Sequence, residues 1–491
     1  MQFRIDIDKA GKVGLRDQIV AEISRLIFEG VLQADTKLPS CRKFSQILDV
    51  SVNTVIAAYG ILEDQHLIYA KPRSGYFVSG YEGARSRERN ALETVVGPGS
   101  RMWERLNWQR RSEDLRTIIR PENWYEYKYP FVCNQIDEDK FPVSHWRECS
   151  RLAMNRKDLK VWSADNHYSD SIELLEQVCT RILPRRGVFE TAESVLVTLG
   201  SQNGLYIASQ LLGGRDRAAT MEDPGYPDAR KILAGSFGEV RFQPVDDEGL
   251  IVDERLRGTT LVFVTPNRQF PTTVTMSERR RKELITVAEA YDFFIVEDDY
   301  ECDVDYRYFT PFPLRSSDAK DRVIYLGSLS KGLSPGLRLG YLAAAPEFVE
   351  AARDLRGTML RHPPIILQHT AAAFLRFGYY ESQLRRLHGD YLARWGIADE
   401  IIRDSLPSFD IKGEFGGTNF VLNDHGNTLS ASAVAREAQT RGVIIEEIAP
   451  CYSQIDIGKF HFRLGVSSIP ASSIEPGIKA LADSIAVLRN C

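Results

Sequence analysis

Apolar residues near the start of the chain recur at helical spacing and are followed by helix-capping residues. Those between positions 19 and 27 share one helical face, and they predict a helix that ends near Gly30. Ser40 and Ser51 stand directly before two further apolar patterns, so each is expected to cap a helix. The last of these predicted helices covers about 51–65.

A predicted β-hairpin completes this first unit. The runs 67–70 and 76–78 read as strands, and Lys71–Gly75 between them reads as a turn. Three helices and a hairpin fit a winged helix-turn-helix (an α+β fold) over residues 1–80, with helix 51–65 in the major groove of DNA. A small three-helix unit of another function fits the spacing equally well.

The pattern changes from about residue 126, where short apolar runs alternate with amphipathic stretches such as 277–291. Uninterrupted apolar runs of this length suit strands that are buried on both faces of a mostly parallel sheet. We therefore predict an α/β domain over residues 126–491. The runs taken as strands are Val195–Leu199, Leu261–Thr265, Phe293–Val296 and Val323–Leu326.

Residues 81–125 show little apolar periodicity and are rich in charge. Nine arginines and six acidic residues fall between positions 81 and 120, which predicts a solvated linker between the two domains. A role of these arginines in holding DNA phosphates is the alternative.

Composition narrows the class of protein. At 491 residues, with 43% hydrophobic and 26% charged residues, the chain has the make-up of a globular protein of several domains. It lacks an apolar run long enough for a membrane span, and its first residues lack a signal peptide, so we expect a cytoplasmic protein with no membrane partner. The seven cysteines form no CxxC pair, which predicts free thiols and no metal site.

The overall charge of the chain does not favour DNA binding, so any DNA contact depends on individual side chains. The net charge is −5, and the first eighty residues hold ten basic and nine acidic side chains. Binding must therefore come from a few well-placed side chains. Ser51, Asn53 and Thr54 begin the predicted groove helix and suit base or phosphate contacts. Arg42 and Arg73 suit phosphates from the flanking elements.

Two segments of the α/β domain suit a phosphate. Gly200–Gly204 joins an apolar strand to an apolar helix, an arrangement that turns backbone N–H groups toward an anion. Ser328 and Ser330 flank the end of another strand just before Lys331, and Arg338 follows seven residues later. An isolated lysine is usually a surface residue, but this serine- and glycine-rich context favours a Schiff-base lysine.

Two further strands end in groups suited to a charged ring and an acid. Asp298 and Tyr300 follow the run Phe293–Val296, where a carboxylate can keep a pyridine nitrogen protonated and a phenol can hydrogen-bond a ring oxygen. A solvated strand end or a metal site is the alternative. Arg463 lies on a strand near the C-terminus and suits a carboxylate or sulfonate, with a structural ion pair as the alternative.

The first unit resembles the GntR family of winged-helix repressors, which implies double-stranded operator DNA as a partner. Val52 stands where that family usually has arginine, so base preference and affinity are expected to differ. The matching pieces are Leu15-x-x-Gln18-Ile19, Leu38-Pro39-Ser40-x-Arg42, Val50-Ser51-x-Asn53-Thr54-Val55, Ala58-Tyr59-x-x-Leu62 and Ser74-Gly75-x-Phe77-Val78.

Residues 130–485 resemble the fold type I aminotransferases that use pyridoxal 5'-phosphate, and the whole chain resembles the MocR/GabR subfamily of GntR regulators. The resemblance implies homodimers, and it implies that Lys331 forms the internal aldimine with the cofactor. The marks that carry it are Met221–Pro227, Val264-Thr265-Pro266-x-x-Gln269-Phe270-Pro271, Glu297–Tyr300 and Ser328–Gly340.

Further roles follow from the same resemblance. Asp298 would pair with the pyridine nitrogen, Tyr300 with the ring oxygen, and Tyr226 would stack on the ring. Arg463 would receive the acid group of an effector. The phosphate would be held by Ser201, Gln202, Ser328, Ser330 and Arg338.

Three departures from the subfamily stand out. Asn267-Arg268 replaces the usual Ser-His, and the added cation either favours an anionic effector or points away. Residues 165–170 lack the glycines of a segment that often contacts the partner subunit. Phe270 replaces the asparagine that usually precedes proline in working aminotransferases, which disfavours an optimised enzyme.

The leading hypothesis is a transcription regulator that senses an amino compound through external aldimine formation at Lys331. A working aminotransferase with an appended DNA-binding domain is the second, because Lys331, Asp298 and Tyr300 are all present. A regulator whose large domain binds its ligand without a covalent bond is the third. The effector and the operator sequence are not encoded in any motif.

Overall fold

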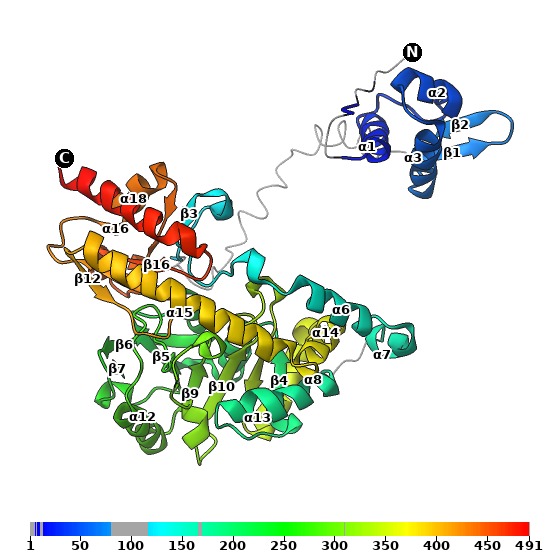
Figure 1. Cartoon of the computed structure of the whole chain (residues 1–491). Helices are drawn as coiled ribbons and strands as arrows, with labels where there is room; N and C mark the ends of the chain where they lie inside the picture. The colour runs from blue at the N-terminus through cyan, green and yellow to red at the C-terminus, as the bar shows by residue number, and fades with distance from the viewer. Residues whose placement is uncertain are drawn as a thin grey trace, which may run out of the picture. The chain divides into compact units, whose positions relative to one another are not determined.

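The computed structural model divides the chain into two compact units, Met1–Gln109 and Arg110–Cys491 (Figure 1). It describes residues 5, 7–9, 13–79, 116–164, 169–308 and 310–490. Most of the predicted linker lies outside these residues, so its boundaries at 80 and 125 stay predictions. Of its arginines, Arg116 and Arg120 are described, and both are half-buried against the large unit.

The small unit is the predicted α+β fold. Ser40 and Ser51 cap their helices as predicted, since their hydroxyls accept hydrogen bonds from the backbone nitrogens of Lys43 and Thr54. Strands β1 and β2 pair antiparallel as the expected hairpin. The described elements are α1 (Leu15–Phe28), α2 (Cys41–Leu48), α3 (Val52–Asp64), β1 (Ile68–Lys71) and β2 (Gly75–Val78).

One buried face of α3 holds this unit together. Val55, Tyr59 and Leu62 are fully buried, and the Tyr59 hydroxyl donates to the carbonyl of Pro39 at 3.0 Å. The first turn of α3 remains exposed at Val52 and Asn53. The hydrophobic core therefore fixes the helix and leaves its N-terminal end open to a partner.

An eight-stranded sheet forms the centre of the described part of the large unit. The predicted parallel runs are present, because β10, β9, β8, β5 and β6 run side by side in one direction. Strand β11 lies antiparallel between β10 and β4. In spatial order the strands are β4 (Val195–Thr198), β11 (Gly340–Ala343), β10 (Val323–Ser328), β9 (Phe294–Asp298), β8 (Leu261–Val264), β5 (Gly214–Asp223), β6 (Phe237–Asp246) and β7 (Gly249–Leu250).

Helices cover both faces of this sheet, which explains the apolar runs. On β8, Leu261 and Phe263 pack into the core that faces α10, α11 and α13, while Val262 and Val264 pack into the core under α12. These helices are α10 (Ser201–Leu212), α11 (Pro227–Ser236), α12 (Glu278–Tyr291) and α13 (Pro346–Leu360).

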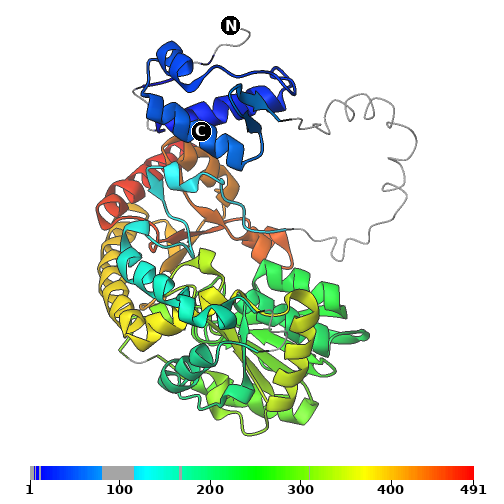
Figure 2. The same ribbon diagram turned by 90° about the vertical axis from the view of Figure 1, so that its right-hand side faces the viewer.

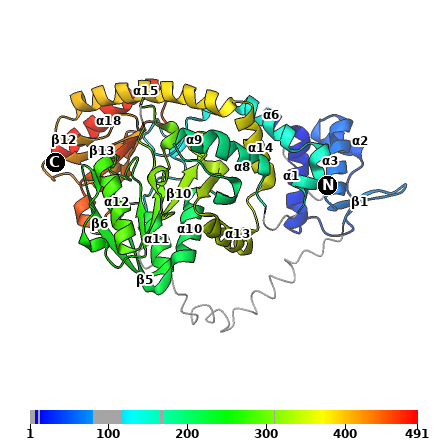
Figure 3. The ribbon, with the colours of Figure 1, turned by 90° about the horizontal axis from the view of Figure 1, so that it is seen from below.

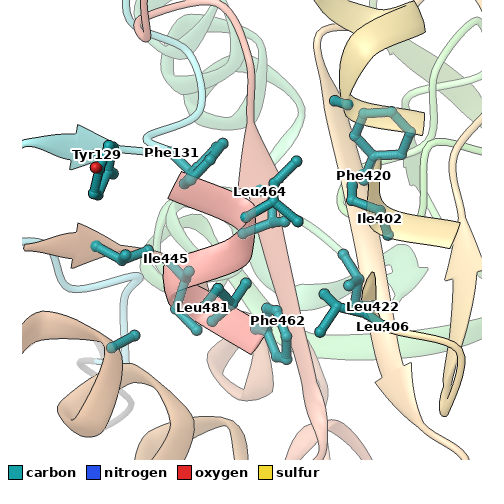
Figure 4. Close-up of a cluster of buried hydrophobic side chains, with 14 of the residues drawn as sticks. Tyr129, Phe131, Ile402, Leu406, Phe420, Leu422, Ile445, Phe462, Leu464 and Leu481 are labelled. Atoms are coloured by element: carbon teal, nitrogen blue, oxygen red, sulfur yellow. The ribbon is translucent and has the colours of Figure 1, made fainter. Parts of the chain in front are cut away.

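A smaller antiparallel sheet lies in the C-terminal part of the large unit, at the opposite end from the large sheet (Figure 2). Figure 4 shows its core, in which Phe420, Phe462 and Leu464 from the strands meet Leu481 from α18. Its strands, in spatial order, are β12 (Phe409–Lys412), β13 (Asn419–Asp424), β16 (His461–Gly465) and β15 (Glu446–Glu447). A separate parallel pair consists of β3 (Tyr129–Pro130) and β14 (Val443–Ile444).

The long helix α15 (Tyr379–Ser405) runs from the side of α14 to the smaller sheet (Figure 3). It therefore connects the two parts of the large unit. The remaining described helices are α6 (Val143–Ala153), α7 (Leu159–Trp162), α8 (Ile172–Gln177), α9 (Leu183–Arg185), α14 (Ile365–Arg376), α16 (Ala431–Thr440), α17 (Ile455–Gly458) and α18 (Ala471–Arg489).

Three negative findings apply to the described residues alone. No single helix there is long and apolar enough to cross a membrane, and α2 and α3 meet the length and composition only when taken together across a 116° bend. No group of three or more His, Cys, Asp or Glu side chains there has the arrangement of a metal site. The described cysteines, at positions 41, 133, 149, 179, 302 and 451, are all free thiols.

Candidate functional site

A cavity of about 260 Å³ lies in the large unit, and all the predicted cofactor and effector residues line it. They reach it from loops that follow different strands and from the smaller sheet. The residues brought together are Ser201, Gln202, Tyr226, Asp298, Tyr300, Ser328, Ser330, Lys331, Arg338 and Arg463.

Strand direction explains why residues so distant in sequence meet. Strands β4, β5, β8, β9 and β10 all point the same way, since β11 is antiparallel to both of its neighbours. Their carboxyl ends share one edge of the sheet, which is where open α/β sheets bind ligands. The cavity lies along that edge, and Arg463 reaches it from β16.

Lys331 is held in the cavity by a residue that the sequence analysis missed. Its Nζ donates a hydrogen bond to Oδ1 of Asn134, and it lies 5.4 Å from the centre of the Tyr300 ring. Burial lowers the pKa of Lys331 to about 8, with Glu301 acting in the opposite direction. A measurable fraction of this amine is therefore neutral, and nucleophilic, near neutral pH.

Asp298 has the properties expected of a partner for a protonated ring nitrogen. Its side chain is buried, and Oδ1 has no hydrogen-bond partner among the described residues. Burial raises the pKa of Asp298 to about 7, while the hydroxyl of Ser201 lowers it. A buried carboxylate oxygen without a donor is costly, and an N–H group from a ligand would remove that cost.

The predicted phosphate-binding residues form a cradle at the start of α10. Gly200 has φ +83°, a conformation that favours glycine, and a Cβ there would lie 3.3 Å from Nη2 of Arg338. The same Nη2 donates to the carbonyl of Leu199 at 3.1 Å. The guanidinium of Arg338 and the N-terminus of α10 therefore face one side of the cavity.

Aromatic rings form another wall. Phe270 lies 5.3 Å from the ring of Tyr226 and 6.2 Å from that of Tyr300, edge-on to both. The Tyr226 hydroxyl donates to Asp228 at 3.1 Å. This wall gives a planar ring an apolar surface to pack on.

Arg463 takes part in an ion pair as well as lining the cavity. Its Nε and Nη2 both lie 2.8 Å from Oε2 of Glu446, and its guanidinium lies 4.6 Å from the centre of the Phe270 ring. The pair that the sequence left as an alternative is thus present. It does not remove Arg463 from the cavity.

The departure at Asn267-Arg268 has a structural explanation. Arg268 is buried, its Nε lies 3.3 Å from Glu301, and it does not line the cavity. Asn267 donates to Asp299 at 2.8 Å, and Arg186 donates to the same carboxylate. These contacts hold the side chain of Asp299, which stands between Asp298 and Tyr300 in the sequence. The charge of Arg268 is balanced inside the fold by Glu301.

The departure at residues 165–170 falls partly within the described residues. Asp165–Tyr168 lie outside the described residues, while Asp170 is buried and pairs with Arg356 at 2.6 Å.

Asn134, Arg120 and Glu446 also line the cavity, and no local motif marks them. Only the contacts of the folded chain identify them.

The predicted DNA-binding residues lie on exposed parts of the small unit. Arg42, Asn53 and Arg73 are exposed, and Thr54 is half-buried. Ser51 is exposed, but its hydroxyl caps α3 and lies 2.8 Å from Oγ1 of Thr54. Arg73 adopts φ 61° in the hairpin turn, which orients it at the tip of the wing. Their contacts with DNA stay predictions.

Comparison with known proteins defines the class. Residues 15–78 match the family described as bacterial regulatory proteins, gntR family, and residues 138–481 match aminotransferase class I and II. The chain is therefore a helix-turn-helix protein that carries an aminotransferase-like domain. That domain implies binding of pyridoxal 5'-phosphate, and the free Oδ1 of Asp298 beside Lys331 in the cavity fits this cofactor.

Individual relatives refine this class. The HTH-type transcriptional regulator TauR of Rhodobacter capsulatus is 35% identical over 97% of both chains. The probable rhizopine catabolism regulatory protein MocR of Rhizobium meliloti is 27% identical and covers 99% of this chain and 96% of its own. An archaeal alanine:glyoxylate aminotransferase structure has a TM-score of 0.65 and 25% identity over 72% of this chain and 89% of its own. The chain belongs to the MocR-type GntR regulators.

Proposed function

We propose that this chain is a cytoplasmic transcription regulator that binds pyridoxal 5'-phosphate at Lys331 and senses an amino compound with an acid group. It binds operator DNA through α3 and the hairpin, as a homodimer suited to paired half-sites. The observation that carries the proposal is the unpartnered Oδ1 of Asp298 in the same cavity as Lys331.

The residues of the chain have distinct tasks. When bound, the cofactor supplies an aldehyde that forms Schiff bases with primary amines. Lys331 competes with the amine of the effector for that aldehyde, and its pKa of about 8 lets it give up or take a proton near neutral pH. Asn134 orients the Nζ of Lys331, and the guanidinium of Arg463 attracts the acid group.

Regulation requires that the two amine-bound states differ in their affinity for DNA. An effector can change DNA binding only by the difference between its affinities for the two states. With the cofactor bound, displacement of the Lys331 amine by the amine of an effector would be the change inside the cavity. We propose that this change biases the contacts of the large unit, and through them the winged helices.

The test is a titration with amines that follows the visible absorbance of the cofactor and DNA mobility in parallel. We expect Lys331→Ala to lose both the Schiff-base absorbance and the response of DNA binding to amines. Lys320→Ala, which removes an exposed lysine, should keep both. Retention of both properties by Lys331→Ala would refute the proposal.

A working aminotransferase is the second candidate, because Lys331, Asp298 and Tyr300 line one cavity. Phe270 argues against it, since an apolar ring occupies the place where such enzymes usually have asparagine. Steady turnover of an amino donor with a keto acid, together with absence of a preferred DNA site, would favour the enzyme over the regulator.

A further inference from the structure

The edge of the Arg463 guanidinium that would bind an acid side-on is already occupied. Glu446 and Arg463 are directly opposite residues of β15 and β16, and Oε2 of Glu446 lies 2.8 Å from both Nε and Nη2. Both side chains are almost fully buried, with 1% and 4% of their surfaces exposed. Because the strand register fixes this pair, a ligand cannot readily take the place of Glu446.

The Nη1 end of Arg463 is the part that remains for a ligand. The ring of Phe270 lies 4.6 Å from the guanidinium. Among the described residues, Nη1 is the guanidinium nitrogen that has no hydrogen-bond or ion-pair partner. An acid group that enters the cavity therefore meets the Nη1 end of Arg463, where three of the five guanidinium N–H donors remain, and a second cation there would bind the oxygens that Arg463 does not reach.

Arg120 offers a second guanidinium in the same cavity. Its Nη1 lies 3.9 Å from Oε1 of Glu446, at the limit of an ion pair, and 3.5 Å from the carbonyl of Cys133. About a third of its side chain is exposed, and no other carboxylate in the described part of the chain pairs with it. Its donors are therefore only weakly engaged.

We propose that Arg120 is a second acid-binding residue of the effector site, and that the acid group lies between Arg120 and the Nη1 end of Arg463. This rests on the function proposed above. Two guanidinium groups and the carboxylate of Glu446 leave a net charge of about +1, by simple charge count, which matches a singly charged carboxylate or sulfonate.

The position of Arg120 also bears on regulation. It lies near the start of the described part of the large unit, close in sequence to Thr117 and Ile118, which line the same cavity. An acid bound to Arg120 thus contacts the segment 116–120, which falls within the predicted linker 81–125. An amine without an acid group makes no such contact.

The experiment compares acid-bearing amines with plain amines of equal length on the cofactor-loaded protein. The probes are glycine, beta-alanine and gamma-aminobutyrate against ethylamine, propylamine and butylamine, and the readout is the shift of the cofactor absorbance. The variants are Arg120→Gln, the charge-conserving Arg120→Lys, and Arg385→Gln as a control that removes an exposed arginine.

We expect Arg120→Gln to weaken the best-binding acid by about tenfold or more, the loss typical of one charged hydrogen bond, and to leave its plain amine unchanged. Arg120→Lys should recover part of this loss, and Arg385→Gln should behave as wild type. A second comparison, on the wild-type chain, pairs an aminoalkyl sulfonate with the phosphonate of equal length. The singly charged sulfonate should bind more tightly than the phosphonate.

Several outcomes would overturn this proposal. They are unchanged acid affinity in Arg120→Gln, an equal loss for the plain amine, tighter binding of the phosphonate, or a wild-type chain that prefers no acid over its plain amine. The first three leave the function proposed above standing when the wild-type chain shows the Schiff-base absorbance, whereas the fourth also removes the acid group from the proposed effector. If that absorbance is absent from the wild-type chain, both proposals fail.

Discussion

Asp298→Asn should stabilise the cofactor-free chain and at the same time weaken its hold on the cofactor. The reason is that Asp298 is buried with Oδ1 unpartnered, a state that disfavours its ionised form. An asparagine has nearly the same shape, keeps an oxygen that can accept from Ser201, and carries no charge. The variant therefore removes a desolvation cost and changes little else.

The magnitude follows from the pKa. Burial raises the pKa of Asp298 from 3.8 to about 7. An acid with a higher pKa in the folded chain takes up a proton on folding, so the chain loses stability as pH rises from the unfolded pKa to the folded one. At about 1.4 kcal/mol per pH unit the full cost is roughly 4 kcal/mol above pH 7, and about 2 kcal/mol of it develops between pH 5.5 and 8.5.

The assay is thermal unfolding of the cofactor-free large unit within the full chain, at pH 5.5 and pH 8.5. The advantage of Asp298→Asn over wild type should be larger at pH 8.5, whereas Asp216→Asn, at an exposed acid, should show no pH-dependent difference. With the cofactor present, loss of a charged hydrogen bond should weaken its binding by about tenfold to a hundredfold. Equal pH dependence, or unchanged cofactor affinity, would refute the argument.

Two further predictions concern the cradle and the DNA surface. Gly200→Ala places a Cβ near Arg338 in a conformation with φ +83°, which costs about 1–3 kcal/mol of strain. Cofactor affinity, measured by titration of the absorbance, should therefore fall by about tenfold, and unchanged affinity would exclude the cradle. Asn53→Ala removes an exposed side chain from the first turn of α3. In a mobility assay the variant should lose about 1–3 kcal/mol of binding free energy on DNA selected by the wild-type chain and none on unrelated DNA. An equal loss on both DNAs would contradict base contact.

Local signals explain the parts of the fold that the sequence could predict. Ser40 and Ser51 predict the starts of their helices, because a capping hydroxyl accepts a hydrogen bond from the backbone nitrogen three residues later. The run Leu261–Thr265 predicts β8 because a strand covered on both faces has no polar side. The Lys331 segment is predicted by its own residues and by family resemblance.

Contacts between distant segments explain what the sequence could not predict. Strand β11 enters the sheet between β4 and β10, and no local pattern sets that order. The pairing of Glu446 with Arg463 depends on the register of β15 against β16, and Asn134 reaches Lys331 across almost two hundred residues. All three arrangements depend on chain topology. The position of Arg120 in the cavity depends on it too, so no local pattern predicts it.

The most direct measurement of the central claim is chemical trapping of the cofactor. The full chain is loaded with pyridoxal 5'-phosphate and reduced with borohydride, and its peptides are then mapped by mass spectrometry. We expect one modified lysine, Lys331, and loss of the modification when an effector amine occupies the cofactor before reduction. Modification of a different lysine, or none at all, would contradict it.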